Sequence, residues 1–404
     1  MNKKINLFII SQCIIMFNFF LCCLRIYAST LVGFSYLLIG VAVVLFLLSG
    51  VYKSFKFSFV PVAFLILLGY MILTDAVNSN FSSFECLMAI ACCLLCYSFS
   101  FFINDREDNI KSLTCLFYVC LACSTIMSLV SLAIMHKDPE NLDGISMQRN
   151  VLASCQCMAV IGSFWLIDLK KKKTLAILPL TILNLYSMIR TRSRTQLIVL
   201  MVFIIIMLIY YAVFAFRKKH NRILVYCVFI ILGLLIAGLV LGFVFKRNAV
   251  DFGSGSVKAI IDRISSGRIA IWDACFDLIA SSPVTGVNNN TFHQKMMDTF
   301  GEDYYHQHSV YIGLMTIHGI PSLVIYVSII IYTIFNSLKL IFSKSELKDT
   351  KRYFFYLAFL AGLLFGDCFE SYTLYSFIPC AYWVFLMFSS IETERLNRKE
   401  TANG

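Results

Sequence analysis

Charged side chains are scarce in this sequence of 404 residues. Only 14% of the residues are Asp, Glu, Lys or Arg, whereas 59% are hydrophobic. A soluble domain carries roughly 25% charged residues. The scarcity therefore excludes a soluble enzyme, a disordered protein and a coiled coil. Apolar runs of about twenty residues also exclude an outer-membrane β-barrel, whose strands alternate between apolar and polar positions.

A disulfide framework is also missing, although the chain has 16 cysteines. Most of them lie inside apolar runs, where cysteine behaves as a small apolar side chain. Cys92, Cys93 and Cys96, and separately Cys155 and Cys157, have spacings that resemble metal sites. No second cluster in a polar loop completes either site, so we expect no metal.

The long apolar runs predict an all-α, polytopic membrane protein. A helix needs about twenty mainly apolar residues to cross the hydrocarbon core. Scanning with that length gives about twelve segments, at 5–24, 30–50, 57–74, 84–104, 112–135, 151–169, 174–190, 195–216, 223–245, 310–336, 352–368 and 374–391. The predicted organisation is nine membrane helices in 1–245, a large loop in 246–309, three further membrane helices in 310–391 and a tail in 392–404.

The distribution of Lys and Arg predicts the orientation of these helices. Most of the 34 basic residues fall in segments on one side of the membrane if both chain ends are cytoplasmic, as the positive-inside rule expects. The exception is Arg190, Arg192 and Arg194, which are packed together on the outer side. Either the helix count is off by one between 174 and 216, or the cluster binds an anion, which the planar guanidinium fork suits.

The large outer loop predicts an amphipathic helix. Its apolar positions recur at helical spacing, at Ile271, Trp272, Cys275, Leu278 and Ile279. Ser265 or Ser266 can cap the start of this helix, and Ser281-Ser282-Pro283 ends it. Arg268 lies in its first turn, where free N–H groups and the helix dipole favour an anion. The alternative is a plain surface helix on the membrane with Arg268 in solvent.

Histidines gather where the large loop meets the next apolar run, at His293, His306 and His308. A histidine at the mouth of a membrane cavity is suited to act as a general base. Two alternatives remain: a metal site, which the two-residue spacing of His306 and His308 disfavours, or ordinary interface residues.

Four stretches together resemble the O-antigen ligase and polymerase superfamily. They are the stretch from Gly144 to Ala153; Thr191-Arg192-Ser193-Arg194-Thr195; Gly267-Arg268 with Trp272, Pro283 and Gly286; and His308-Ser309 with Tyr311, followed by Gly319-Ile320-Pro321. The order, spacing and sidedness of the stretches carry the resemblance, which covers residues 144 to 325. Ser309 departs from the pattern, in which Asn is commoner, and this puts the acceptor geometry in doubt.

The resemblance implies a membrane glycosyltransferase with a GT-C-like fold in the bacterial inner membrane and its large loop in the periplasm. Such proteins move a glycan from undecaprenyl pyrophosphate onto an acceptor hydroxyl on lipid A–core or on a lipid-linked glycan. The reaction is inverting and needs no cofactor or metal, and no nucleic acid takes part.

Each candidate residue then has an expected role. We expect Arg192, Arg194 and Arg268 to bind the pyrophosphate and stabilise its developing charge, with Arg149 and Arg190 as further contacts. We expect His308 to activate the acceptor hydroxyl. His306 and Tyr311 are reserve candidates at the acceptor site.

Three functions remain open on the sequence alone. An O-antigen ligase transfers finished polymer to lipid A–core, and an O-antigen or capsule polymerase transfers a growing chain to a new repeat unit. The single large outer loop and the basic composition favour the ligase, since 136–150 is short. The third function is a secondary transporter or flippase. A transporter usually places acids or bases in mid-membrane, but Asp168, Asp367 and Glu370 lie near helix ends.

The predicted orientation places residue 290 outside the cell membrane. An Asn290→Cys variant, in a background without reactive native thiols, should be labelled in intact cells by a membrane-impermeant thiol reagent. Labelling that occurs only after lysis would invert the topology.

Overall fold

The computed structural model describes residues 3–82, 84–103, 105–168, 171–217, 268–301, 307–343, 347–371, 374 and 377–403. All of the regular elements in these ranges are helices. The predicted membrane segment 223–245, the first part of the large loop and His306 lie outside the described residues.

Fourteen α-helices make up the described chain, together with short 3₁₀ and π turns at Tyr27–Leu31, Val51–Ser54, Asn80–Ser82 and Lys172–Ala176. The helices are α1 (Lys3–Cys22), α2 (Val32–Ser49), α3 (Phe59–Val77), α4 (Phe84–Ser100), α5 (Arg106–Lys137), α6 (Arg149–Leu166), α7 (Ile177–Arg190), α8 (Arg194–Arg217), α11 (Arg268–Ser281), α12 (Asn289–Phe300), α13 (Val310–His318), α14 (Ile320–Phe342), α15 (Leu347–Gly366) and α16 (Pro379–Asn403).

Six described helices are long and apolar enough to cross a membrane. The spans are Lys4–Cys22, Val32–Ser49, Phe59–Val77, Arg106–Lys137, Arg194–Ala212 and Ile320–Phe342. Each of the eight predicted segments between 5 and 216 coincides with one helix, α1 to α8. The fold is therefore all-helical and consistent with a polytopic membrane protein. The count of twelve membrane helices and the GT-C-like fold stay predictions.

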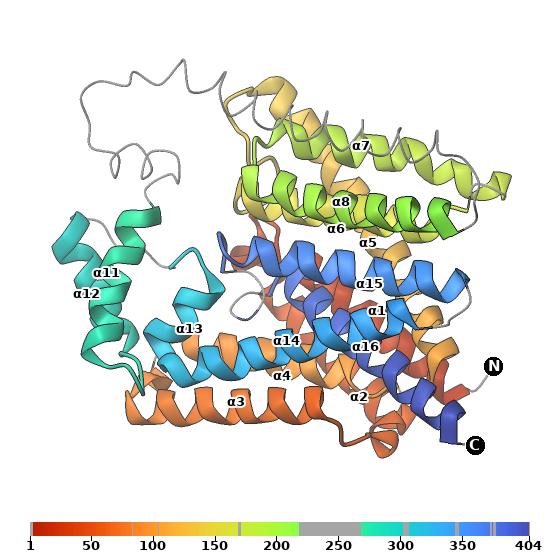
Figure 1. Ribbon diagram of the computed structural model, residues 1–404. Helices are drawn as coiled ribbons and strands as arrows, with labels where there is room; N and C mark the ends of the chain where they lie inside the picture. The colour runs from red at the N-terminus through yellow and green to blue at the C-terminus, as the bar shows by residue number, and fades with distance from the viewer. Residues whose placement is uncertain are drawn as a thin grey trace.

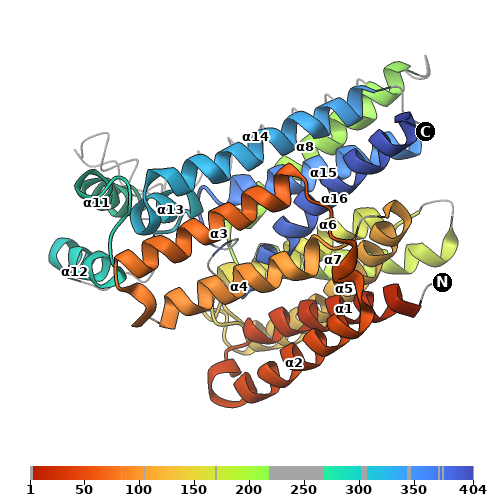
Figure 2. The same ribbon diagram turned by 90° about the horizontal axis from the view of Figure 1, so that it is seen from below.

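The long helices run along one common direction, and the short helices gather at one end of them (Figures 1 and 2). Helices α11, α12 and α13 lie at this end, which we call the loop end. Both chain termini lie at the opposite end, which we call the terminal end. The described part of the large loop and the two termini thus occupy opposite ends of the bundle, and their sides of the membrane stay a prediction.

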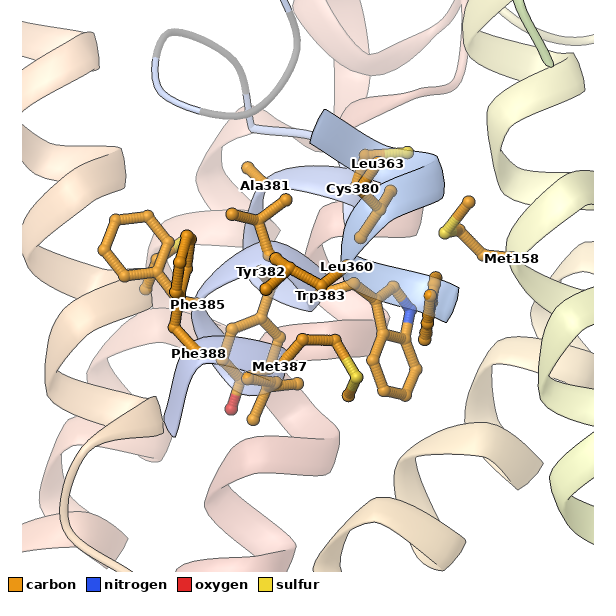
Figure 3. Close-up of a cluster of buried hydrophobic side chains, with 14 of the residues drawn as sticks. Met158, Leu360, Leu363, Cys380, Ala381, Tyr382, Trp383, Phe385, Met387 and Phe388 are labelled. Atoms are coloured by element: carbon orange, nitrogen blue, oxygen red, sulfur yellow. The ribbon is translucent and has the colours of Figure 1, made fainter. Parts of the chain in front are cut away.

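Aromatic side chains fill the centre of the bundle around α16 (Figure 3). Tyr382, Trp383, Phe385 and Phe388 are 0–2% exposed. The ring of Trp383 stacks on Phe117 of α5, with the ring centroids 4.3 Å apart. Between membrane helices, close packing of this kind supplies association energy that the hydrophobic effect cannot.

Buried amides and hydroxyls join α5, α6 and α7. Asn184 of α7 accepts hydrogen bonds from Ser124 and Ser128 of α5, at 2.7 and 2.9 Å. Gln156 of α6 donates to Ser187 of α7 at 2.5 Å. Polar side chains in apolar surroundings need partners, so this network fixes the position of α6 against its neighbours.

The predicted segment 310–336 is wrong as a single membrane helix. It is split at Gly319 into α13, which has nine residues, and α14. Gly319 has φ +79°, and a Cβ atom there would lie 1.9 Å from the backbone oxygen of Val284. Pro321 in the first turn of α14 also lacks the N–H that an uninterrupted helix would need.

The predicted tail 392–404 is not separate from the last helix, because α16 continues to Asn403. Glu394 is 2% exposed and forms ion pairs with Arg352 of α15 and, at 3.6 Å, with Arg106 of α5. Arg352 and Arg106 neutralise the carboxylate of Glu394, which the sequence pattern predicts to lie in solvent. Helix α16 can therefore continue past Glu394.

The break at Gly319 yields a stability prediction. Gly319→Ala should lower the free energy of unfolding by at least about 3 kcal/mol, because it adds a backbone clash to a conformation that essentially only glycine adopts. Thermal unfolding of the purified protein in detergent measures the loss.

Two other glycines serve as controls. Gly301 has φ +70° but open space around it, so Gly301→Ala should cost only about 1 kcal/mol. Gly40 lies within α2 with nothing within 4 Å, and Gly40→Ala should be neutral or stabilising. Equal effects at all three positions would contradict the proposed clash.

Candidate functional site

Helices α11, α12 and α13 pack together through a second apolar cluster, separate from the core of the bundle. Helix α11 contributes the apolar face that its sequence predicts, with Ile271 and Cys275 fully or almost fully buried. Burial raises the pKa of the Cys275 thiol to about 12, so this cysteine is not a nucleophile near neutral pH. Trp272 of α11 donates its indole N–H to the backbone oxygen of Gln307 at 2.9 Å.

The connection between α11 and α12 is attached to the end of α3. Tyr70 donates to the backbone oxygen of Val284 at 2.6 Å, and Asn78 donates to that of Thr285 at 2.9 Å. Asn288, which also caps α12, donates to the backbone oxygen of Asn78 at 2.8 Å. These bonds hold the α11–α12 unit in place at the loop end.

A buried carboxylate, Glu370, joins residues that are far apart in sequence. Its side chain is 5% exposed and forms an ion pair with Arg268 at the start of α11. Asn150, at the start of α6, donates to the same carboxylate oxygen at 2.8 Å. The other oxygen lies 3.6 Å from Nδ1 of His308. Three of the four sequence stretches identified above therefore meet at one residue.

His308 combines access to solvent with an unusual backbone. Its side chain is 36% exposed, and its φ of +52° is uncommon for a residue other than glycine. The next residue, Ser309, caps α13 through its hydroxyl, and the N–H of Val310 donates to the backbone oxygen of Asp367 at 2.9 Å. Nδ1 of His308 is the ring nitrogen that faces Glu370.

The three predicted arginines between α7 and α8 lie at the same end of the bundle as Glu370. A Cβ atom placed on Gly366 would lie 2.9 Å from the side chain of Val199 in α8. The first part of α8 therefore lies beside the end of α15 at Gly366, and Glu370 follows four residues later. Arg192 and Arg194 are exposed there, and Arg192 has φ +55°. Arg190 bonds the hydroxyl of Tyr186 at 3.4 Å.

The remaining predicted residues differ in their surroundings. Arg149 is exposed at the first position of α6, and its backbone N–H donates to Asp143 at 2.9 Å. Tyr311 donates its hydroxyl to the backbone oxygen of Leu364 at 2.8 Å, which ties it to α15. Within the described ranges, no group of three or more His, Cys, Asp or Glu side chains is placed to hold a metal ion.

Comparison with known families connects this geometry to a class of protein. The family described as O-antigen ligase matches residues 179–327. This match supports the O-antigen ligase-related superfamily. The matched segment includes most of α7, all of α8 and α11 to α13, and so contains Arg190, Arg192, Arg194, Arg268 and His308. A search of curated proteins found no match.

The family supports a membrane glycosyltransferase-like enzyme of the ligase or polymerase type, and lipid-linked glycan substrates in general. Asn150 and Glu370 lie outside the matched segment, one on each side of it. The cluster around Glu370 therefore combines residues of the matched segment with residues from the rest of the chain.

Glu370 is not among the residues that the sequence predicts for the site. The sequence pattern indicates only an acid near a helix end, although an acid that follows an apolar helix requires a cationic partner when it is buried. The partner, Arg268, is 102 residues away in sequence, so no local pattern connects the two.

The coupling between Glu370 and Arg268 can be measured. Glu370→Gln should destabilise the protein by about 3 kcal/mol, because it leaves the largely buried Arg268 without its counter-charge. In a double-mutant cycle with Arg268→Gln, the two effects should be non-additive by at least about 1 kcal/mol. Thermal unfolding in detergent provides the four values.

An exposed ion pair gives the matched control. Lys295 and Asp277 lie 3.0 Å apart on α12 and α11, with side chains 34% and 71% exposed. The same cycle on this pair should give a coupling near zero. Additive effects for Glu370 and Arg268 would contradict the ion pair.

Proposed function

We propose that this protein is a glycosyltransferase that moves a glycan from undecaprenyl pyrophosphate onto an acceptor hydroxyl at the outer face of the bacterial inner membrane. The observation that carries the proposal is the arrangement around Glu370, which holds a guanidinium and an imidazole on its two oxygens. Transfer from a pyrophosphate needs a cation at the leaving group and a base at the acceptor, and these two groups supply them.

The donor pyrophosphate binds to arginines. Arg268 uses one terminal nitrogen for Glu370, and the other guanidinium N–H groups remain able to donate to phosphate oxygens. Arg192 and Arg194 add charge from the start of α8, with Arg149 and Arg190 as outer contacts. Helix α11 begins at Arg268, so the dipole at its N-terminus favours the same anion.

The acceptor reacts beside His308. The acceptor oxygen forms a bond to the anomeric carbon as the bond from that carbon to the pyrophosphate oxygen breaks, and the configuration inverts. The hydroxyl proton passes to Nε2 of His308, and undecaprenyl pyrophosphate leaves with the bonding electrons. Glu370 is a positioning residue, because it orients the imidazole and stabilises its charged form. No metal is required in this scheme.

The proposed acceptor is lipid A–core, which makes the protein an O-antigen ligase. The large loop supports this choice, since its described part forms one packed unit at one end of the bundle (Figure 1). Repeat-unit polymerisation uses the same donor chemistry and is the second candidate. Deletion of the gene separates them: loss of a ligase leaves polymer on undecaprenyl pyrophosphate, and loss of a polymerase leaves core capped by one repeat unit.

Substitution of the arginines tests the proposed donor site. Arg194→Ala and Arg268→Ala should each lower glycan transfer about a hundredfold or more, since each removes charge stabilisation from the transition state. Transfer is measured with purified protein and lipid-linked donor, and membrane levels are compared by immunoblot.

Lys295→Ala is the control, because Lys295 is a basic residue of the same unit that pairs with Asp277 at the surface. It should keep wild-type activity. Wild-type transfer by either arginine variant would remove the proposed pyrophosphate site.

A further inference from the structure

A second basic site lies at the terminal end of the bundle, far from Glu370. A cavity of about 530 Å³ opens between α14 and α16, and its lining includes Tyr332, Phe335, Lys339, Ser343, Arg395 and Arg398. Ligand sites have volumes of roughly 300–1,000 Å³. Helix α14 starts beside the loop end and has 23 residues, so its last turn lies about 30 Å away at a rise of 1.5 Å per residue.

The lining of this cavity carries an excess of positive charge. Lys339 lies over the ring of Phe335, with its ammonium nitrogen 4.3 Å from the ring centroid. Arg398 hydrogen-bonds the hydroxyl of Ser343. Arg395 forms a bidentate pair with the carboxylate of Glu392, at 2.7 and 2.8 Å. Among the described lining residues, three side chains are basic and none is acidic.

The cavity also lies at the depth of lipid headgroups. Helix α14 is apolar enough to span a membrane over Ile320–Phe342, and Lys339 is in its last turn. Next to the cavity, Phe335 and Phe342 are 55% and 71% exposed, as expected for side chains that face acyl chains. Basic pockets at the ends of membrane helices hold phosphate headgroups in this position.

We propose that this cavity binds the phosphate headgroup of an anionic phospholipid in the leaflet at the terminal end. Lys339 and Arg398 contact the phosphate, and the rings of Tyr332 and Phe335 pack along the glycerol and upper acyl region. This site is independent of glycan transfer and would exist whatever the reaction at Glu370.

A simpler explanation is that these cations only orient the chain in the membrane. Lys53 distinguishes the two explanations. It is exposed, follows α2 and lies 5.9 Å from the ring centroid of Tyr52, so it has the same charge and a similar aromatic neighbour. It also belongs to the terminal end, because Phe59 at the start of α3 packs on Tyr332, with ring centroids 4.4 Å apart. Lys53 does not belong to the lining of the cavity.

The test measures binding of phosphatidylglycerol to the full-length protein. Native mass spectrometry counts retained lipid, and thermal unfolding is compared in nanodiscs of phosphatidylcholine with and without phosphatidylglycerol. We expect wild type to retain the anionic lipid and to be stabilised by it. Lys339→Gln and Arg398→Gln should each weaken binding about fivefold, and Lys53→Gln should not.

Two results would overturn the proposal. The first is equal lipid binding by wild type, Lys339→Gln and Arg398→Gln. The second is full displacement of the stabilisation by millimolar inorganic phosphate, which would identify a soluble anion as the ligand. We expect the Arg268→Ala protein to lose glycan transfer but to bind phosphatidylglycerol as wild type does. Failure of the lipid-site proposal can therefore be distinguished from failure of the proposed glycan transfer.

Discussion

The ion pair between Glu370 and Arg268 is the contact on which the site depends. A charged carboxylate that is 5% exposed is costly unless a cation and hydrogen-bond donors satisfy it. Arg268 and Asn150 do so, and they come from helices that are far apart in sequence. The fold must therefore bring the starts of α6 and α11 to the end of α15, and in doing so it also places His308 beside the same carboxylate.

Helices α11, α12 and α13 keep Arg268 and His308 beside Glu370 because they are packed against one another and against the bundle. Gly319 allows α13 to end against the α11–α12 connection, where the N–H of Ile320 donates to the backbone oxygen of Pro283 at 2.8 Å. Tyr70 and Asn78 hold the other side of the same connection. A catalytic group needs this support, since small displacements greatly reduce the rate of an oriented reaction.

Local patterns predicted α1 to α8, the position of α11 and two residues of the candidate site that the fold brings together, Arg268 and His308. Each depends on apolar length, helical period or residue chemistry, which a sequence displays directly. The break at Gly319 was visible as Gly-Ile-Pro, but the surrounding apolar residues concealed a nine-residue helix. Glu370 and the extension of α16 through Glu394 were missed because their stability comes from Arg268 and Arg352, partners that only the tertiary fold brings near.

In the proposed mechanism, the Glu370 cluster catalyses glycan transfer without any ion gradient. The most direct measurement is transfer by purified protein in detergent, from an undecaprenyl pyrophosphate-linked glycan to lipid A–core, with wild type and Glu370→Gln compared at equal folded concentration. We expect product from wild type and a loss of turnover of about a hundredfold or more in the variant. Wild-type turnover by folded Glu370→Gln, or no product from either protein, would contradict it.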